Sequence, residues 1–264
     1  MCLIVHIPGG VPPDLRGDAL AYASASTENN PDGWGVLYRA SAGGQRWLVA
    51  RGLDRAGLST VLDRLADRAV EVVVHTRLAT HGAAVIERTH PFKVRPIRGW
   101  IVHNGVFRGY PSRRDGPTDT ERWRDEWLSP LIRLAGEERW NAADRRLDRL
   151  IGQLSGGSRV LIASTARTAR YGAWVRGAPG PAAEVPWYSR DPAVACAPRR
   201  AVAAPIVAPI VAPVAARPAP ARPAPAPARP STDWLDRPVV GVRPTPPRSI
   251  AEYLDGLDLD WWRQ

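Results

Sequence analysis

The amino-acid sequence predicts a mixed α and β domain in which two stacked sheets lie between layers of helices. Residues 70–75 form a near-continuous β-branched run, which is typical of a strand covered on both faces. Hairpin signals surround this run, and residues 118–154 have helical spacing late in the domain. A sheet that is buried on both faces, together with helices that can cover an outer face, favours an architecture of stacked layers.

Apolar spacing and turn residues predict the individual elements. Asp14 follows two prolines and is expected to cap a helix over 14–26. A turn at residues 30–33 precedes a strand pair that is joined across residues 41–44, and three leucines mark a helix over 55–67. We expect strands at 3–7, 34–38, 46–50, 70–75, 99–103, 159–164 and 171–176, and a break in the late helices near residue 136.

The composition divides the chain into a folded domain over 2–195, a linker over 196–249 and a tail over 250–264. The linker contains a Pro/Ala repeat, which cannot pack a core and should form an extended spacer. The tail alternates acidic and apolar residues and contains two adjacent tryptophans near its end. Two interpretations of the tail stay open: it folds back on its own domain, or it is a docking peptide for a partner.

The bulk composition argues against several classes of protein. The net charge is +10, but residues 197–250 carry eight arginines against two aspartates, so we expect no specific nucleic-acid binding by the folded domain. Because there is no apolar run of membrane-spanning length and no leader pattern, we expect a cytoplasmic protein without membrane association. Neither the two cysteines nor the four clustered histidines follow a metal-binding signature, so no metal or other cofactor is expected.

Cys2 directly follows the initiator methionine. Removal of Met1 would place a thiol and an α-amine on one residue, with pKa values of about 8.5 and about 7.7–8.0, so that proton transfer between them is nearly balanced. The alternative is a small apolar residue that opens a buried strand. For Cys2 taken alone we favour that alternative, and the motifs between residues 30 and 121 reverse the preference.

Polar residues follow the buried strand, where residues 75–82 leave it and turn at a glycine. Arg77, Thr80 and His81 should therefore cluster at a strand exit, where polar groups can converge on a ligand. Arg77 could bind a carboxylate through two hydrogen bonds. The alternative for Arg77 is a salt bridge at the domain surface.

Two further motifs offer hydrogen-bond donors and an acid. Asn104 provides a side-chain N–H and Gly105 a backbone N–H at one place, and such a pair can form an oxyanion hole. For this dipeptide taken alone, we favour the alternative of an ordinary Asn-Gly turn between strands. Asp119 opens the long helix, where it serves either as a cap or first-turn acid, or as a ligand for an ammonium group.

Together these elements resemble the glutaminase domain of class II glutamine amidotransferases, which are N-terminal-nucleophile hydrolases. The resemblance spans Cys2 to about Ser189, and its six motifs occur in the family's order. They are Met-Cys at the start, Asn-Pro-Asp-Gly-Trp-Gly at 30–35, and the segments 75–82, 89–91, 103–105 and 118–121. The resemblance implies an α+β fold, a four-layer αββα sandwich.

The resemblance also implies a glutaminase reaction. Cys2 attacks the side-chain amide of L-glutamine, with its own α-amine as base. Asn104 and Gly105 stabilise the oxyanion, ammonia leaves, and water hydrolyses the thioester to glutamate.

A second set of residues is implied to hold the amino-acid end of the substrate. Arg77 binds the α-carboxylate with help from Thr80 and His81, and Asp119 binds the α-ammonium group. Trp34 and His90 shape the pocket.

The sequence departs from the family pattern in three respects, one of which is a slightly longer arm between His90 and Asn104 than in amino-sugar synthases of the family. Leu78 stands where amino-sugar synthases of the family often carry tryptophan, and no acceptor domain follows the glutaminase segment. The ammonia is therefore expected to pass to a separate synthase, or the enzyme acts as a free-standing glutaminase.

Two alternative functions remain. The first is an N-terminal-nucleophile amidohydrolase for another small amide, against which Arg77 and Asp119 argue. The second is a non-catalytic scaffold that works through the basic linker and the tail, against which the intact Cys2, Asn104 and Arg77 argue.

Overall fold

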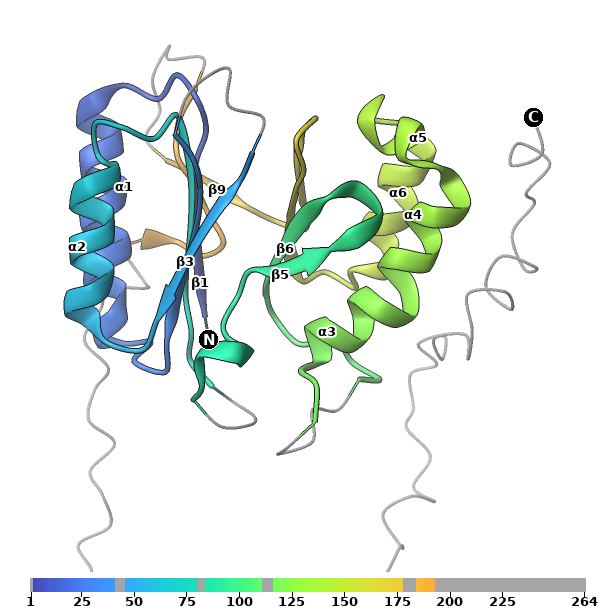
Figure 1. Cartoon of the computed structure of the whole chain (residues 1–264), viewed down its shortest axis with the longest axis horizontal. Coiled ribbons are helices and arrows are strands. Elements are labelled where there is room, and N and C mark those ends of the chain that lie inside the picture. The colour runs from blue at the N-terminus through green and yellow to red at the C-terminus, as the bar shows by residue number, and fades with distance from the viewer. Residues whose placement is uncertain (1, 41–45, 80–83, 111–115, 178–183, 193–264) are drawn as a thin grey trace, which may run out of the picture. The chain divides into compact units, whose positions relative to one another are not determined.

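The computed structural model describes residues 2–40, 46–79, 84–110, 116–177 and 184–192 (Figure 1). The predicted linker over 196–249 and the tail over 250–264 lie outside the described residues, so the domain boundaries stay predictions. In the described ranges, no helix is both long enough and apolar enough to cross a membrane.

The described strands form two antiparallel sheets. The first sheet has the order β3-β2-β4-β1-β10-β9, and the second has the order β5-β6-β7-β8. The strands of the first sheet are β1 (Leu3–Ile7), β2 (Trp34–Arg39), β3 (Leu48–Gly52), β4 (Glu71–Thr76), β9 (Val175–Arg176) and β10 (Trp187–Tyr188). Those of the second sheet are β5 (Phe92–Val94), β6 (Gly99–Asn104), β7 (Arg159–Ala163) and β8 (Thr168–Tyr171).

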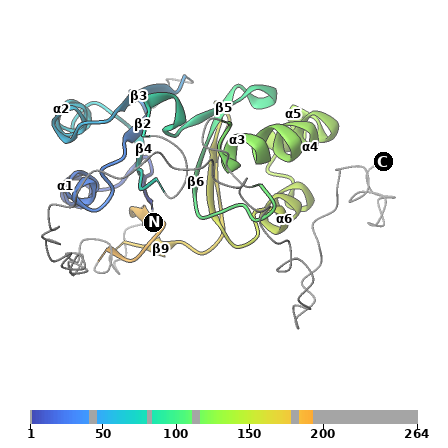
Figure 2. The same cartoon turned by 90° about the horizontal axis from the view of Figure 1, so that it is seen from below.

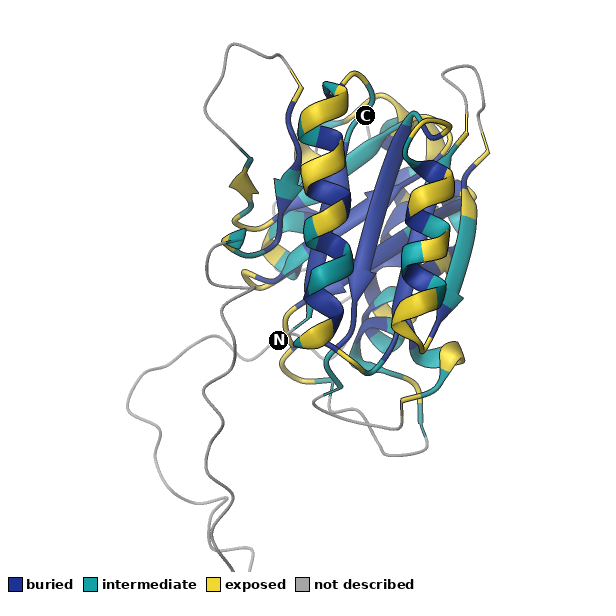
Figure 3. Cartoon of the chain, turned by 90° about the vertical axis from the view of Figure 1, so that its left-hand side faces the viewer, coloured by how far each residue is buried: buried dark blue, intermediate teal, exposed yellow. Residues whose placement is uncertain are grey.

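Helices cover the outer face of each sheet (Figures 1 and 2). The first sheet is covered by α1 (Pro13–Ala25) and α2 (Arg55–Leu65), as Figure 3 shows from that side. The second is covered by α3 (Asp119–Trp123), the π-helical segment η4 (Arg124–Leu128), α4 (Ser129–Ala135), α5 (Glu137–Asn141) and α6 (Arg145–Leu154). Short 3-10 turns are η1 (Ser26–Glu28), η2 (Ile86–Arg88) and η3 (Arg95–Ile97).

The period of two in a strand explains why this sequence builds four layers. Val72 and Val74 of β4 pack under α1 and α2, whereas Val73 points the other way and packs between the sheets. Val73 meets Val102 and Leu161 of the second sheet there. Both faces of β4 are thus buried, as its β-branched run predicts, and the αββα order of layers is confirmed.

The strand and helix predictions are confirmed in outline, but the expected cap of the first helix is wrong. The helix starts at Pro13 with Pro12 in the N-cap position, and no side chain makes a capping hydrogen bond there. Asp14 instead lies in the first turn. Proline needs no N–H acceptor in the first turn, so the two prolines already start this helix.

The predicted strand over 171–176 is also wrong. Its residues belong to two strands in different sheets, because the chain turns at Gly172 with a φ of 87°. A Cβ on Gly172 would lie 2.2 Å from the Ser158 carbonyl oxygen, so only glycine fits this close backbone approach.

The late helical stretch is more divided than the sequence predicts. The break at Gly136 is confirmed, with a φ of 91°. A second break follows at residues 142–144, and Asp144 caps α6 by accepting hydrogen bonds from the Arg146 and Leu147 N–H groups. Strand β5 was missed, because three residues around the exposed Lys93 give too short an alternation to detect.

Candidate active site

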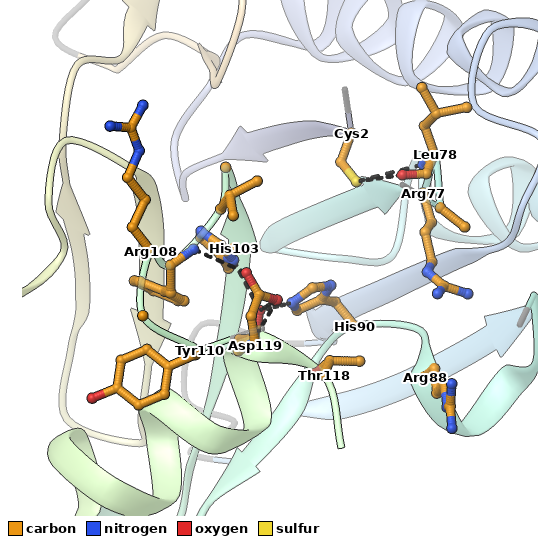
Figure 4. Close-up of a pocket in the computed structure, with 16 residues that line it drawn as sticks. Cys2, Arg77, Leu78, Arg88, His90, His103, Arg108, Tyr110, Thr118 and Asp119 are labelled. Carbon is orange, nitrogen blue, oxygen red and sulfur yellow. Dashed lines mark hydrogen bonds between the residues drawn. The ribbon is translucent and has the colours of Figure 1, made fainter. Parts of the chain in front are cut away.

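A cavity of about 370 Å³ opens where β1 begins and where β4 and β6 end. Cys2, Arg77 and Leu78 lie on one side of it, and Thr118 and Asp119 lie on the other (Figure 4). Its remaining lining residues are Ala79, Arg88, His90, His103, residues 105–110 and Thr120. The antiparallel order of the first sheet explains the meeting point, because β1 begins beside the end of β4, with Leu3 opposite Thr76.

The thiol of Cys2 faces the backbone of Leu78. The Leu78 N–H donates to Sγ at 3.4 Å, and Sγ lies 3.6 Å from the Leu78 carbonyl oxygen as a donor. Burial raises the pKa of the Cys2 thiol, while the Leu78 N–H and the charge of Arg77 act in the opposite direction. The thiol is therefore held in a fixed position and needs a base to become a thiolate.

Residues 30–33 support the exit from β4. The Arg77 N–H donates to the Gly33 carbonyl at 2.7 Å, and the Asp32 N–H donates to the Arg77 carbonyl at 3.0 Å. The Asp32 carboxylate also accepts a hydrogen bond of 2.7 Å from the Ala79 N–H. The sequence predicts a turn here, within one of the six motifs, and in the structure this segment positions the backbone that contacts Cys2.

Arg77 lines the cavity and is only 6% exposed. Burial lowers the pKa of its guanidinium, and the nearby Cys2 and Asp32 act in the opposite direction. An arginine pKa stays far above neutrality under such shifts, so the group remains a cation. The side chain is thus buried at the cavity wall, where its charge can meet an anionic group.

Asn104 is buried at the end of β6 and is bonded to the last strand of the first sheet. Its Nδ2 donates to Ser189 Oγ at 2.9 Å, and the same oxygen accepts a hydrogen bond of 2.8 Å from the Ile4 N–H. The Ser189 N–H in turn donates to the Ile4 carbonyl at 2.9 Å. Ser189 thus links the amide of Asn104 to the strand that begins beside Cys2, a role that no local sequence pattern predicts.

Gly105 lines the cavity and adopts a φ of 148°, which side chains rarely allow. A Cβ at this position would lie 2.4 Å from Ser158 Oγ and 3.1 Å from His103 Nε2. The backbone of Gly105 can therefore reach the cavity only because the residue has no side chain. Asn104 itself is 3% exposed and does not line the cavity.

Asp119 is not the cap of its helix. Thr118 caps α3 through a capping box with Glu121, which leaves Asp119 in the first turn. Asp119 Oδ2 accepts a hydrogen bond of 2.9 Å from the Phe107 N–H, and Oδ1 accepts one of 2.8 Å from the Thr120 N–H. The carboxylate thus lies at the cavity wall, where it also holds the loop after β6.

Three histidines are buried behind and beside the cavity. The His103 and His90 rings each contact Thr120 Oγ1, at 2.8 and 3.3 Å, and the His75 and His90 ring centroids lie 4.4 Å apart. Burial lowers the pKa of His75 and of His103 to about 3, and that of His90 well below its usual value. All three are neutral at pH 7.

The structure brings together five of the seven residues that the sequence predicts: Cys2, Arg77, Gly105 and Asp119 line the cavity, and Asn104 lies beside it. Thr80 and His81 lie outside the described residues. His90 lines the cavity as expected, but Trp34 does not, since it packs under α2. Among the described residues, no group of three or more His, Cys, Asp or Glu side chains is placed to hold a metal ion.

The comparisons with known proteins point to one family. The family model described as "Glutamine amidotransferases class-II" matches residues 2–155. A "putative glutamine amidotransferase" of Haemophilus influenzae is 29% identical over 135 residues, which cover 46% of this chain and 45% of that protein. A glutamine–fructose-6-phosphate aminotransferase of Streptococcus pyogenes is 34% identical over 91 residues, which cover 28% of this chain and 15% of that protein. The chain thus matches less than half the length of either relative.

Two solved structures show lower similarity. The glutamine phosphoribosylpyrophosphate amidotransferase of B. subtilis is 15% identical, with a TM-score of 0.45, over 72% of this chain and 42% of that one. A glutamine aminotransferase class-II domain protein of Silicibacter pomeroyi is 17% identical, with a TM-score of 0.38, over 71% of this chain and 87% of that one.

A four-layer αββα sandwich with a cysteine at the start of a central strand is the architecture of an N-terminal-nucleophile hydrolase. Because the family model covers more than half of the chain, this protein belongs to the class II glutamine amidotransferases.

Proposed function

We propose that this protein hydrolyses the side-chain amide of L-glutamine to glutamate and ammonia. The observation that carries the proposal is one cavity that holds a thiol, a buried cation and a carboxylate, supplied by Cys2, Arg77 and Asp119. A free amino acid has one anionic and one cationic group at its α-carbon. A site with one charge of each sign beside a nucleophile suits such a substrate.

In the proposed reaction, removal of Met1 exposes the α-amine of Cys2. The amine accepts the thiol proton while Sγ attacks the amide carbon, since burial raises the pKa of the thiol and favours its protonated form. Asn104 Nδ2 and the Gly105 N–H donate to the oxyanion that forms. Asn104 Nδ2 donates one hydrogen to Ser189, which orients the amide, and in this proposal its second hydrogen is the one donated to the oxyanion.

Two steps follow from the tetrahedral intermediate: ammonia is lost, and the thioester that remains is hydrolysed. The carbon–nitrogen bond breaks and the amide nitrogen leaves as ammonia, with the proton returned by the α-amine. Water attacks the γ-glutamyl thioester, the carbon–sulfur bond breaks, and glutamate and the thiol of Cys2 are restored. Arg77 holds the α-carboxylate and Asp119 the α-ammonium group throughout, and Thr80 and His81 assist Arg77.

The fate of the ammonia forms a second part of the proposal. One relative is named a glutamine–fructose-6-phosphate aminotransferase. By analogy we propose that a separate synthase accepts the ammonia made here. In the purified chain, ammonia and glutamate should form in equal amounts. Addition of the cognate synthase and its acceptor should lower free ammonia relative to glutamate, and an unchanged ratio with every candidate would contradict this part.

The glutaminase activity is tested by intact mass and turnover. The mass should show loss of Met1, followed by one adduct from the glutamine analogue 6-diazo-5-oxo-norleucine. The Cys2→Ala variant should take up no adduct and release no ammonia from glutamine, while its thermal melt matches that of the parent. Normal turnover in Cys2→Ala, or a processed Cys2 that does not react, would refute the proposal.

A further inference from the structure

A second cavity, of about 500 Å³, lies at the opposite end of β6 from the candidate active site. Trp100 lines it near the start of β6, whereas Asn104 ends the same strand. At about 3.4 Å per residue, these two residues are about 13 Å apart along the strand. The two cavities share no lining residue. The second cavity opens between the segment before β3 and the β5–β6 hairpin, so each sheet supplies one wall.

The charge of this cavity is of one sign. Four of its lining residues are cationic and exposed, namely Arg46, Lys93, Arg95 and Arg98, and none is acidic. Within the described part of the chain, none of the four forms an ion pair. Residues 41–45, which precede Arg46, include no Asp or Glu in the sequence. Like charges gathered in a concave site repel one another and concentrate anions from solution.

Other arginines of the domain behave differently. Arg39 pairs with Glu71, and Arg167 pairs with Asp148. The four cations around the cavity have no such carboxylate partner among the described residues.

Two tryptophans give the cavity an aromatic wall. Trp47 is 5% exposed and is fixed from behind, because its Nε1 donates to the Ser164 carbonyl at 2.7 Å and the Arg39 guanidinium lies 4.9 Å from its ring centroid. Trp100 is only half-buried, and it lies opposite Lys93 in the β5–β6 register. A planar ring stacked on Trp100 would thus lie within reach of a cation on the neighbouring strand.

The backbone conformation of Arg98 is a further feature of this cavity. Arg98 adopts left-handed values, with φ 47° and ψ 33°, directly after the 3-10 turn η3. Such a conformation costs a residue with a side chain about 1 kcal/mol or more, and it is often found where the chain clamps a ligand. Glycine or asparagine would meet the backbone requirement with less strain, so an arginine here points to a use for its charge.

We propose that this cavity binds a nucleotide, with its phosphates on Lys93, Arg95 and Arg98 and its base on Trp100. The cavity volume falls within the range of small-molecule sites, about 300–1,000 Å³. A hollow of this kind favours a compact anion over a nucleic-acid strand, which is bound along an extended basic groove. The proposal does not rest on the glutaminase reaction, because it uses neither the catalytic cavity nor its residues.

The test is isothermal titration calorimetry on the full chain, with ATP, inorganic pyrophosphate and adenosine as probes. The double variant Lys93→Ala/Arg95→Ala removes two of the cations. The matched control Arg64→Ala/Arg68→Ala removes two exposed arginines at the end of α2 and just beyond it. The variant Trp100→Leu removes the ring. Thermal melts establish that each variant is folded, and no glutaminase assay is needed.

We expect ATP to bind the parent and the control alike, and to bind the double variant at least about tenfold more weakly, since each lost charge-assisted hydrogen bond costs about tenfold or more. Trp100→Leu should weaken ATP while leaving pyrophosphate unchanged, and adenosine should bind far more weakly than ATP. The proposal is overturned if ATP does not bind, or binds the double variant as well as the control. Equal binding of ATP to Trp100→Leu and to the parent overturns the assignment of a nucleotide, because the ring then contributes nothing.

Discussion

Replacement of Ser189 by alanine tests how the second sheet is coupled to the nucleophile. Ser189 is fully buried, and its hydroxyl accepts hydrogen bonds from the Ile4 N–H and from Asn104 Nδ2. Without the hydroxyl, two buried donors lose their acceptor. A buried donor without an acceptor costs about 1–3 kcal/mol. Because the surrounding structure can relax around the two donors, Ser189→Ala should lower the free energy of unfolding by about 2–4 kcal/mol.

The same change should slow the proposed reaction. Complete loss of an oxyanion donor costs about 100- to 1,000-fold in kcat, and a donor that keeps its side chain but loses its orientation should cost less, about tenfold. We therefore expect kcat for glutamine to fall about tenfold with little change in KM, because Ser189 positions Asn104 and does not touch the α-carbon end of the substrate.

The assays are steady-state glutamate formation and urea unfolding. The matched control is Ser164→Ala, because Ser164 is also buried and its hydroxyl accepts a hydrogen bond of 3.0 Å from Trp140 Nε1, away from the catalytic cavity. The control should lose stability and keep kcat. If Ser189→Ala is destabilised to the same degree but retains the parent kcat, the reasoning about Asn104 is refuted.

Three further predictions concern substrate binding, the cavity backbone and acid stability. Arg77→Ala should raise KM for glutamine about 10- to 100-fold in steady-state assays, as expected for a lost charged hydrogen bond, and an unchanged KM would contradict its role. Gly105→Ala should abolish turnover in the same assay, because its Cβ would lie 2.4 Å from Ser158 Oγ and its φ of 148° strains any side chain, and normal turnover would contradict this reasoning. Burial raises the pKa of Glu71, but hydrogen bonds from His6 and the charge of Arg39 hold it at about 2 instead of 4.5. Because the pKa of Glu71 is lower in the folded protein than in the unfolded chain, its carboxylate stabilises the fold above pH 4.5, and this contribution is lost as the pH falls towards 2. Urea unfolding should therefore show that the parent loses up to about 3 kcal/mol more stability over this pH range than Glu71→Gln does. Equal losses in the two proteins would contradict the prediction.

Most of the fold follows from local sequence patterns. The β-branched run of β4 and the leucine spacing of α2 each depend on neighbours in the chain, and both elements form where they are expected. The failure at residues 171–176 has a cause farther away in the chain. The turn at Gly172 is dictated by the Ser158 carbonyl, and no periodicity near Gly172 reports that contact.

The candidate site divides in the same way. Cys2, Arg77 and Asp119 could be predicted because a recognisable motif surrounds each one. Ser189 and Asp32 could not be predicted as positioning residues, because each acts through one or two hydrogen bonds to segments far away in the sequence or across a turn. A serine at a strand end and an aspartate in a turn have common local explanations.

The neutral histidines clarify which group can serve as the base. Burial holds the pKa of His75 and of His103 at about 3, so neither imidazole has the basicity to accept a proton from a thiol whose own pKa is raised. An imidazole that stays neutral also adds no positive charge that would compete with Arg77 for the substrate carboxylate. An α-amine has a pKa of about 7.7–8.0, which is far closer to that of a thiol. In the proposed reaction, removal of Met1 therefore supplies a base that these two histidines cannot provide.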